Sequence, residues 1–116
     1  MEISEILTTT KQTDFYQIDQ FIIKELDMSN TATVTDHYRD QNKALSTKCL
    51  ILDLENINYI DSSGIGCLIS LQIKDYGPKK LILTNVKGKI WNIFIISGIE
   101  NKIHKAENLK EAISQV

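Results

Sequence analysis

The sequence has few residues of the kinds that mark secreted, membrane-spanning or nucleic-acid-binding proteins. Its two cysteines, Cys49 and Cys67, are too few for a disulfide framework and lie within apolar runs, so we expect two buried thiols in a reducing cytosol. No apolar run approaches the ~18 residues of a membrane span, and the first residues lack the basic region of a signal peptide. Fifteen acidic residues against thirteen basic ones argue against nucleic acid as a partner. The sequence therefore predicts a cytoplasmic protein that binds neither nucleic acid nor a membrane.

The chain also lacks any linker or internal repeat that would divide it. Its 116 residues suffice for one core, so we expect a single domain over residues 1–116. The charge is uneven, because residues 1–60 carry a net charge of −5 and residues 61–116 a net charge of +3. A solvated face accounts for this asymmetry, and the alternative is a pair of oppositely charged surfaces that recognise a protein partner.

Strand patterns and helix patterns alternate along the chain. Two β-rich runs, 3–9 and 15–24, flank a polar turn at 11–14 and predict an antiparallel hairpin. The continuous apolar run at 48–54 is typical of a central strand that is buried on both faces. The remaining expected elements are a helix within 31–46 capped by Ser29 or Asn30, a helix at 62–76 stopped by Gly77-Pro78, a strand at 80–85, a helix at 87–97 closed by Gly98, a short strand at 102–105, and a helix capped by Asn108.

This order predicts an α/β fold with right-handed crossovers. We expect a mostly parallel, four- to five-stranded mixed sheet with an antiparallel N-terminal edge strand and with helices packed around it.

The segment most suited to chemistry joins the central strand to the helix that follows. Carboxyl ends of parallel strands are where such sheets usually hold their ligands. Asp61, Ser62 and Ser63 stand at the expected helix start, where their side chains can accept hydrogen bonds from free backbone N–H groups. Gly64 and Gly66 would leave the backbone open to close approach by another molecule. A purely structural N-cap explains the same residues about equally well.

Several enzymatic interpretations of this corner fail on spacing. A third glycine for a dinucleotide loop, the Gly-Lys-Ser/Thr of a P-loop and the Gly-x-Ser-x-Gly of a hydrolase elbow are all missing from the sequence. The cysteines and the two histidines, His37 and His104, lack metal-ligand spacing, so we expect no metal site. Trp91 and Ile95 lie off the apolar face of their helix, which leaves open whether that helix is buried on most sides or offers an apolar contact to a partner.

The run Tyr-Ile-Asp-Ser-Ser-Gly-Ile-Gly at 59–66 resembles the signature of the STAS domain family. The resemblance is to its small single-domain bacterial anti-sigma factor antagonists. Three other segments match that family in the same order: Glu25-Leu26-Asp27, Leu50 to Leu54, and Phe94 to Ile99. Lys24 departs from the family pattern, since a glycine usually stands there. The polar segment 28–46 implies a first helix that is short or shifted.

The resemblance implies a phosphorylation switch. In such antagonists the first serine of the Asp-Ser-Ser-Gly run, here Ser62, is phosphorylated by a partner that is both serine kinase and anti-sigma factor. The unmodified protein binds this partner and frees the sigma factor, and a serine phosphatase resets the switch. Asp61 would position the serine, Ser63, Gly64 and Gly66 would shape the corner, and Asp27 would lie on the facing loop. The resemblance implies no cofactor and no catalysis by this chain.

Two rival functions remain. The first is a structural subunit in a signalling scaffold or a transporter assembly, because the same sequence run fits that role. The second is a nucleotide-hydrolysing enzyme that uses the same corner, with His37 or His104 as a base for a serine nucleophile.

Overall fold

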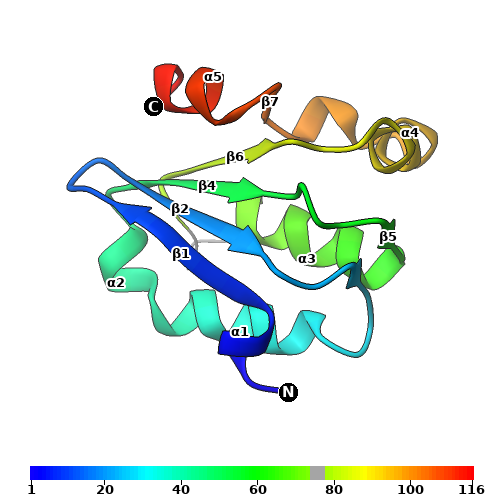
Figure 1. Ribbon diagram of the computed structural model, residues 1–116, viewed down its shortest axis with the longest axis horizontal. Coiled ribbons are helices and arrows are strands. Elements are labelled where there is room, and N and C mark those ends of the chain that lie inside the picture. Colours follow the sequence, from blue (N-terminus) through cyan, green and yellow to red (C-terminus); the bar gives the residue numbers. More distant parts are fainter. Residues whose placement is uncertain (74–77) are drawn as a thin grey trace.

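Three parallel strands form the centre of the structure, a computed structural model that describes residues 1–73 and 78–116. They are β2 (Tyr16–Phe21), β4 (Cys49–Asp53) and β6 (Lys80–Thr84). At one edge β1 (Leu7–Gln12) pairs antiparallel with β2, and at the other β7 (Lys105–Ala106) pairs parallel with β6. The order β1-β2-β4-β6-β7 (Figure 1) confirms the expected mixed sheet with an antiparallel N-terminal edge strand.

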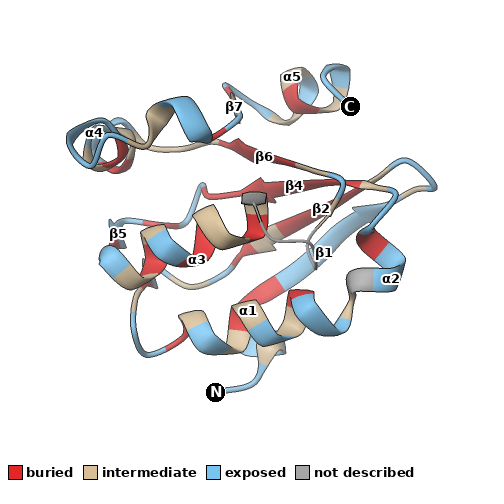
Figure 2. Cartoon of the chain, turned by 180° about the vertical axis from the view of Figure 1, so that it is seen from behind, coloured by how far each residue is buried: buried red, intermediate tan, exposed pale blue. Residues whose placement is uncertain are grey.

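Helices cover both faces of this sheet. Helices α1 (Thr31–Asp40), α2 (Asn42–Leu45) and α3 (Ser62–Ile73) lie on one side, and α5 (Leu109–Ser114) lies on the other (Figure 1). Helix α4 (Gly88–Ile96) inserts Ile90 and Phe94 into the same hydrophobic cluster as α1 and α3. Figure 2 shows that the buried residues concentrate in β2, β4 and β6, which lie between these helices.

The core is divided by the central strand β4, which is buried at all five positions. Successive side chains of a strand point to opposite faces. Leu50 and Leu52 therefore join the larger cluster with α1, α3 and α4, whereas Ile51 joins a smaller cluster with Ile82 and Ala112 beneath α5. The prediction of a central strand buried on both faces is confirmed.

The N-terminal hairpin forms, but its strands are shorter than the runs 3–9 and 15–24. Residues Ile3–Glu5 adopt a 3₁₀ turn, η1, because the backbone N–H of Glu2 donates to Oε1 of Glu5 at 3.1 Å, and β1 starts only at Leu7. In the turn between the two strands, Oγ1 of Thr13 accepts hydrogen bonds from the backbone N–H groups of Phe15 and Tyr16. The chain beyond Phe21 leaves the sheet for a separate strand, β3 (Glu25–Leu26).

The first helix is short, as its polar sequence implied. It ends at Asp40, and the single turn of α2 follows after Gln41. Asn30 occupies the N-cap position of α1, but its side chain does not cap the helix. Its Oδ1 accepts from the Asp27 N–H at 3.1 Å and its Nδ2 donates to the Glu25 carbonyl at 2.8 Å. Asn30 therefore braces the loop that precedes the helix.

The second half follows the sequence prediction more closely. Gly98 ends α4 with a φ of 72°, and the Asn108 side chain caps α5 by accepting from the Glu111 N–H at 2.9 Å. The short strand expected at 102–105 forms slightly later, as β7, after a 3₁₀ turn, η2 (Glu100–Lys102). The expected extension of α3 to residue 76 and its stop at Gly77 lie outside the described residues.

Candidate functional site

A two-stranded sheet outside the main one brings the two candidate loops together. Strand β3 pairs in parallel with β5 (Tyr59–Ile60), in the register Glu25 with Tyr59 and Leu26 with Ile60. The backbone N–H of Asp61 donates to the Leu26 carbonyl at 3.3 Å. This pairing places the loop that contains Asp27 directly beside the start of α3, as the resemblance implied.

Asp61 is the residue that joins these loops. Its Oδ1 accepts from the Gly64 N–H at 2.9 Å, three residues on, which is the geometry of an N-cap side chain. Its Oδ2 accepts from the Met28 N–H at 3.1 Å, across the gap between the loops. The helix cap therefore belongs to Asp61, and one carboxylate fixes both the helix start and the facing loop.

The two serines that follow are left available by this arrangement. Ser62 is the first residue of α3 and is exposed, whereas Ser63 is half-buried. Neither hydroxyl, and neither backbone N–H, has a hydrogen-bond partner among the described residues. Two free N–H groups and an exposed hydroxyl thus meet at the positive end of a helix.

The two glycines of the corner differ in what surrounds them. A Cβ on Gly64 would lie against the Leu26 carbonyl oxygen and only 2.5 Å from Cγ1 of Ile60. The expectation that Gly64 is open to another molecule is therefore wrong, because the chain's own β3 already occupies that space. Gly66 is exposed with nothing within 4 Å of its Cβ direction, and it lies four residues after Ser62 on the same side of the helix.

This difference gives a matched pair of variants. Gly64→Ala should lower the free energy of unfolding by about 1–3 kcal/mol, since the added methyl overpacks the β3 contact. Gly66→Ala should leave it unchanged or raise it by up to about 1 kcal/mol, because alanine favours the helix. Urea unfolding of both variants measures the effect, and equal stability of the two would show that the Leu26 contact imposes no constraint.

Asp27 serves the shape of its loop. Its Oδ1 accepts from the N–H of Ser29 at 2.9 Å and from the Ser29 hydroxyl at 2.5 Å. These two hydrogen bonds stabilise the carboxylate and lower the pKa of Asp27 below its ordinary value. Met28 lies between Asp27 and Ser29 in this turn, and its side chain is exposed.

Lys24 stands where the resembled family has glycine, and the turn accommodates it. Its side chain is exposed, and its carbonyl accepts from the N–H groups of Asn58 at 2.7 Å and Tyr59 at 3.2 Å. Among the described residues other than glycine, only Asn85 has a positive φ, so Lys24 needs no backbone conformation that favours glycine.

The loop that leads from β4 to β5 is held by polar contacts from several elements. The Lys87 ammonium donates to the Glu55 carbonyl at 2.7 Å and to Oδ1 of Asn58 at 2.6 Å. The buried carboxylate of Asp53 accepts from the Glu55 N–H at 2.9 Å and from Nδ2 of Asn85 at 3.1 Å. These contacts hold β5, and with it the start of α3, in a fixed position.

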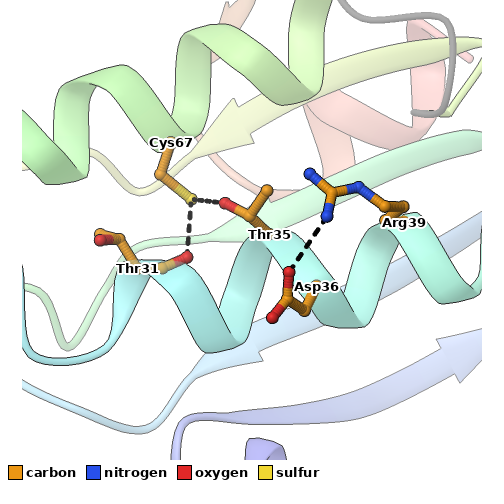
Figure 3. Close-up of polar contacts among 5 residues, drawn as sticks. All are labelled: Thr31, Thr35, Asp36, Arg39 and Cys67. Atoms are coloured by element: carbon orange, nitrogen blue, oxygen red, sulfur yellow. Dashed lines mark hydrogen bonds and ion pairs between the residues drawn. The ribbon is translucent and has the colours of Figure 1, made fainter.

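Cys67 fastens α3 to α1 (Figure 3). Its thiol accepts from the Thr35 hydroxyl at 3.5 Å and donates to the Thr31 carbonyl at 3.9 Å. Burial raises the pKa of Cys67, so it remains a neutral thiol. One turn further along α1, Asp36 and Arg39 form an exposed ion pair at 3.3 Å. The core role expected for Cys67 is confirmed, and Cys49 is buried as well.

Two exposed apolar residues flank the serines, and sequence reasoning did not assign them to the site. The Met28 side chain is 80% exposed and that of Tyr59 is 51% exposed. The backbone N–H of Met28 donates a hydrogen bond to the Asp61 carboxylate. Tyr59 lies in β5, two residues before Asp61. Their position beside the motif could have identified them from the sequence, because an apolar side chain that flanks a polar turn is seldom buried in the core.

The other candidates lie away from this corner. His37 is half-buried on α1 with its ring against that of Tyr38, and His104 is exposed before β7. Neither is hydrogen-bonded to Ser62. On α4 the Trp91 ring packs edge-on against Phe94, but Ile95 is about half exposed and Ile96 more so, so this helix is not buried on most sides. In the part of the chain that is described, no three metal-ligating side chains cluster, and no helix is long and apolar enough to span a membrane.

Comparison with known proteins agrees with the fold and the motif. The STAS domain profile matches residues 8–112. An anti-sigma-B factor antagonist of Staphylococcus aureus (strain NCTC 8325) is 28% identical over 108 residues, covering 87% of this chain and 92% of that protein. The resemblance inferred from residues 59–66 is therefore confirmed.

Solved structures share the fold at lower sequence identity. The anti-sigma factor antagonist SpoIIAA in its unphosphorylated form superposes with a TM-score of 0.72 at 19% identity, covering 94% of each chain. The murine Solute Carrier 26 family member A9 anion transporter gives a TM-score of 0.74 at 18% identity, over 90% of this chain and 18% of the transporter. The same fold thus occurs both as a small protein and as part of a large one.

Proposed function

Because this chain belongs to the STAS domain family, we propose that it is an anti-sigma factor antagonist whose binding is switched by phosphorylation of Ser62. The unphosphorylated protein binds an anti-sigma factor that is also a serine kinase, and this releases the sigma factor. Phosphorylation ends the complex, and a serine phosphatase restores the binding form. The chain acts in this cycle as a regulator, with residues 1–116 as one domain, and the kinase supplies the catalysis.

The observation that carries this proposal is the state of Ser62. Its hydroxyl is exposed, has no partner in residues 1–73 and 78–116, and stands at the first position of a helix whose cap is made by Asp61. A structural N-cap serine would instead direct its oxygen to a backbone N–H. The interpretation of Ser62 as a mere cap is therefore disfavoured, and a role toward another molecule is favoured.

A phosphate on Ser62 fits this helix end. It adds a charge of about −1.5 to −2 and three strong acceptor oxygens. The N–H groups of Ser62 and Ser63 are without acceptors in the described structure, and the helix dipole favours an anion there. The folded state thus tolerates the modification, and its effect falls on the surface that meets the partner.

That surface consists of Met28, Tyr59, Ser62 and Gly66, which we call the Ser62 surface. Tyrosine at the centre of an interface often contributes much of the binding energy, and methionine adapts to the shape of a partner. Gly66 adds no side chain beside Ser62, so a partner can approach the helix backbone closely. Asp27 and Asp61 support this surface by fixing the loop and the helix start.

Tyr59 allows a test of the Ser62 surface. Tyr59→Ala should weaken binding of the anti-sigma factor at least about tenfold, because it removes a large exposed contact at the centre of the surface. Phe15→Ala is the matched control. Phe15 is an aromatic residue of similar size, 74% exposed, and it lies in the hairpin turn at the opposite end of the sheet. Calorimetric titration measures both. Equal loss in the two variants, or loss with Phe15→Ala alone, would place the interface elsewhere.

The function itself is tested by competition. The chain is added to a preformed complex of a sigma factor and its anti-sigma factor from the same organism, with the anti-sigma factor chosen as one that is also a serine kinase. The chain should release the sigma factor, and prior incubation with the kinase and ATP should abolish release and place the phosphate on Ser62. A phosphopeptide map dominated by Ser63, or a complex that stays intact at saturating chain, contradicts the proposal.

A further inference from the structure

A cavity of about 440 Å³ lies at the end of the sheet where β4 and β6 begin, opposite the Ser62 surface. Its position follows from the parallel strands, because Cys49 begins β4, Lys80 begins β6 and the hairpin turn precedes β2. Asp61 and Ser62 instead follow the carboxyl end of β4. In Figure 1 the tip of the β1–β2 hairpin marks the cavity's end of the molecule, and β5 marks the other. Among the described residues, those that line it are Phe15, Thr47, Cys49, Lys79, Lys80 and Val116.

Two of the lining residues, Phe15 and Val116, are apolar but belong to neither hydrophobic cluster of the core. Phe15 is 74% exposed and Val116 is 47% exposed, so both leave apolar surface at the cavity. The thiol of Cys49 is buried beneath them, and burial raises its pKa although Lys80 opposes this effect. Cys49 is thus a neutral thiol that behaves as a small apolar group.

The rest of the lining is basic. Lys79 is exposed, and Lys80 is half-buried with its ammonium donating to the Gln115 carbonyl at 2.8 Å. An ammonium group has three N–H donors, so Lys80 retains donors for a ligand. Lys48 lies between the lining residues Thr47 and Cys49 in the sequence. The exposed acidic residue Asp14 directly precedes Phe15 in the hairpin turn. The described side chains of the lining therefore combine two ammonium groups with apolar walls.

We propose that this cavity binds an amphipathic carboxylate, a carboxylic acid with an unbranched apolar chain of medium length. The volume lies within the range of roughly 300–1,000 Å³ that is usual for small-molecule sites. The carboxylate would pair with Lys79 and Lys80, and the apolar chain would lie against Phe15, Val116 and the Cys49 thiol. Such a site is separate from the phosphorylation switch, so it persists whether or not Ser62 is modified.

Sodium decanoate is the probe for this site. We titrate it into the ¹⁵N-labelled full chain at concentrations below micelle formation and follow amide chemical shifts. Shift changes should saturate and concentrate at Phe15, Thr47, Cys49 and Lys80. Decan-1-ol, which has the same chain length without the charge, should bind at least about tenfold more weakly, because it forms no ion pair with the lysines.

Charge reversal gives the matched variants. Lys79→Glu should weaken decanoate binding at least about tenfold, whereas Lys89→Glu, at an exposed lysine of α4, should leave it unchanged. Equal affinity for decanoate and decan-1-ol, equal loss in both variants, or shift changes centred on Met28 and Tyr59 would each overturn the proposal. So would binding to phosphatidylglycerol vesicles without any binding of monomeric decanoate, since that result indicates a membrane surface as the ligand.

Discussion

Replacing Tyr38 by phenylalanine should lower the free energy of unfolding by about 2 kcal/mol, because its hydroxyl makes a buried hydrogen bond to a carboxylate. Replacing Tyr38 by alanine should cost about 5 kcal/mol, since the ring is also lost from the core. Tyr38 is fully buried on α1, and its hydroxyl donates to Oδ2 of Asp19 at 2.6 Å. The alanine variant approaches the whole stability of a small domain, so the phenylalanine variant provides the quantitative measure.

The size of this effect follows from the other partners of Asp19. This carboxylate is 1% exposed on β2 and also accepts from Oγ1 of Thr9 at 2.7 Å and from Nε2 of Gln17 at 3.0 Å. A buried carboxylate is costly unless its lone pairs are satisfied. Among the described residues, removing the Tyr38 hydroxyl leaves Oδ2 of Asp19 with only Nε2 of Gln17, at 3.0 Å. The network connects β1, β2 and α1, so all three elements lose support.

Tyr16→Phe is the control for the Tyr38 variants. Tyr16 lies on the same strand as Asp19, but it is only half-buried and its hydroxyl has no partner among the described residues, so its loss should change stability by less than about 0.5 kcal/mol. Urea unfolding of the three variants makes the comparison. If Tyr38→Phe were as stable as Tyr16→Phe, the Asp19 hydrogen bond would contribute nothing to folding.

The pH dependence offers an independent check of the same contact. Burial raises the pKa of Tyr38 well above its ordinary value of 10.0, and the neighbouring Asp19 carboxylate raises it further. The folded protein therefore keeps a proton that the unfolded chain releases above about pH 10. The stability contributed by this proton is fully present below about pH 10 and is lost as the pH rises beyond it. The difference between parent and Tyr38→Phe should accordingly shrink in alkaline solution.

This network also explains which parts of the fold were predictable from sequence. The buried strand at 48–54 and the last helix were predicted well, because continuous apolar runs, apolar helical spacing and a cap residue are local features. Helix α1 was predicted only to lie within 31–46, without definite bounds, since only Val34 and Tyr38 are buried in it and its threonines are poor helix formers. Its place is fixed by contacts with distant residues, such as Asp19 and Cys67, that no local pattern contains.

The candidate site shows the same division. Asp61, Ser62 and Asp27 were placed on facing loops by a motif, and the structure brings their loops together through β3 and β5. The sequence did not distinguish Gly64 from Gly66, because only the pairing of β3 reveals which glycine the Leu26 carbonyl approaches. Met28 and Tyr59 were missed for a similar reason, as exposure of an apolar residue is a property of the folded surface.

Replacing Ser62 by aspartate should weaken binding of the anti-sigma factor at least about tenfold, and this loss should occur without loss of stability. The new carboxylate stands at the first position of α3, where the helix dipole favours negative charge, so the melting temperature should stay close to that of the parent. On binding, however, the charge must leave water at an interface. Desolvating an unpaired charge costs several kcal/mol, and every 1.4 kcal/mol is tenfold in affinity.

Ser62→Ala separates the hydroxyl from the charge. Since Asp61 makes the helix cap and the Ser62 hydroxyl has no partner among the described residues, alanine should change neither stability nor affinity noticeably. This variant should remain bound in the presence of kinase and ATP, because it cannot be phosphorylated. Ser97→Asp is the matched charge control, since Ser97 is equally exposed but lies at the end of α4. It should bind like the parent.

Calorimetric titration of the three variants against the anti-sigma factor, with a thermal melt of each, distinguishes the mechanisms. Aspartate carries less charge than phosphoserine, so phosphorylated protein should bind more weakly still than Ser62→Asp. If Ser62→Asp bound like the parent while the phosphorylated protein did not, the size and oxygens of the phosphate would be responsible, not charge alone. If the phosphorylated protein also bound like the parent, Ser62 would lie outside the interface and the switch would require another residue. If Ser97→Asp lost as much affinity as Ser62→Asp, the effect would reflect the overall charge of the protein and not the position of Ser62 at the start of α3.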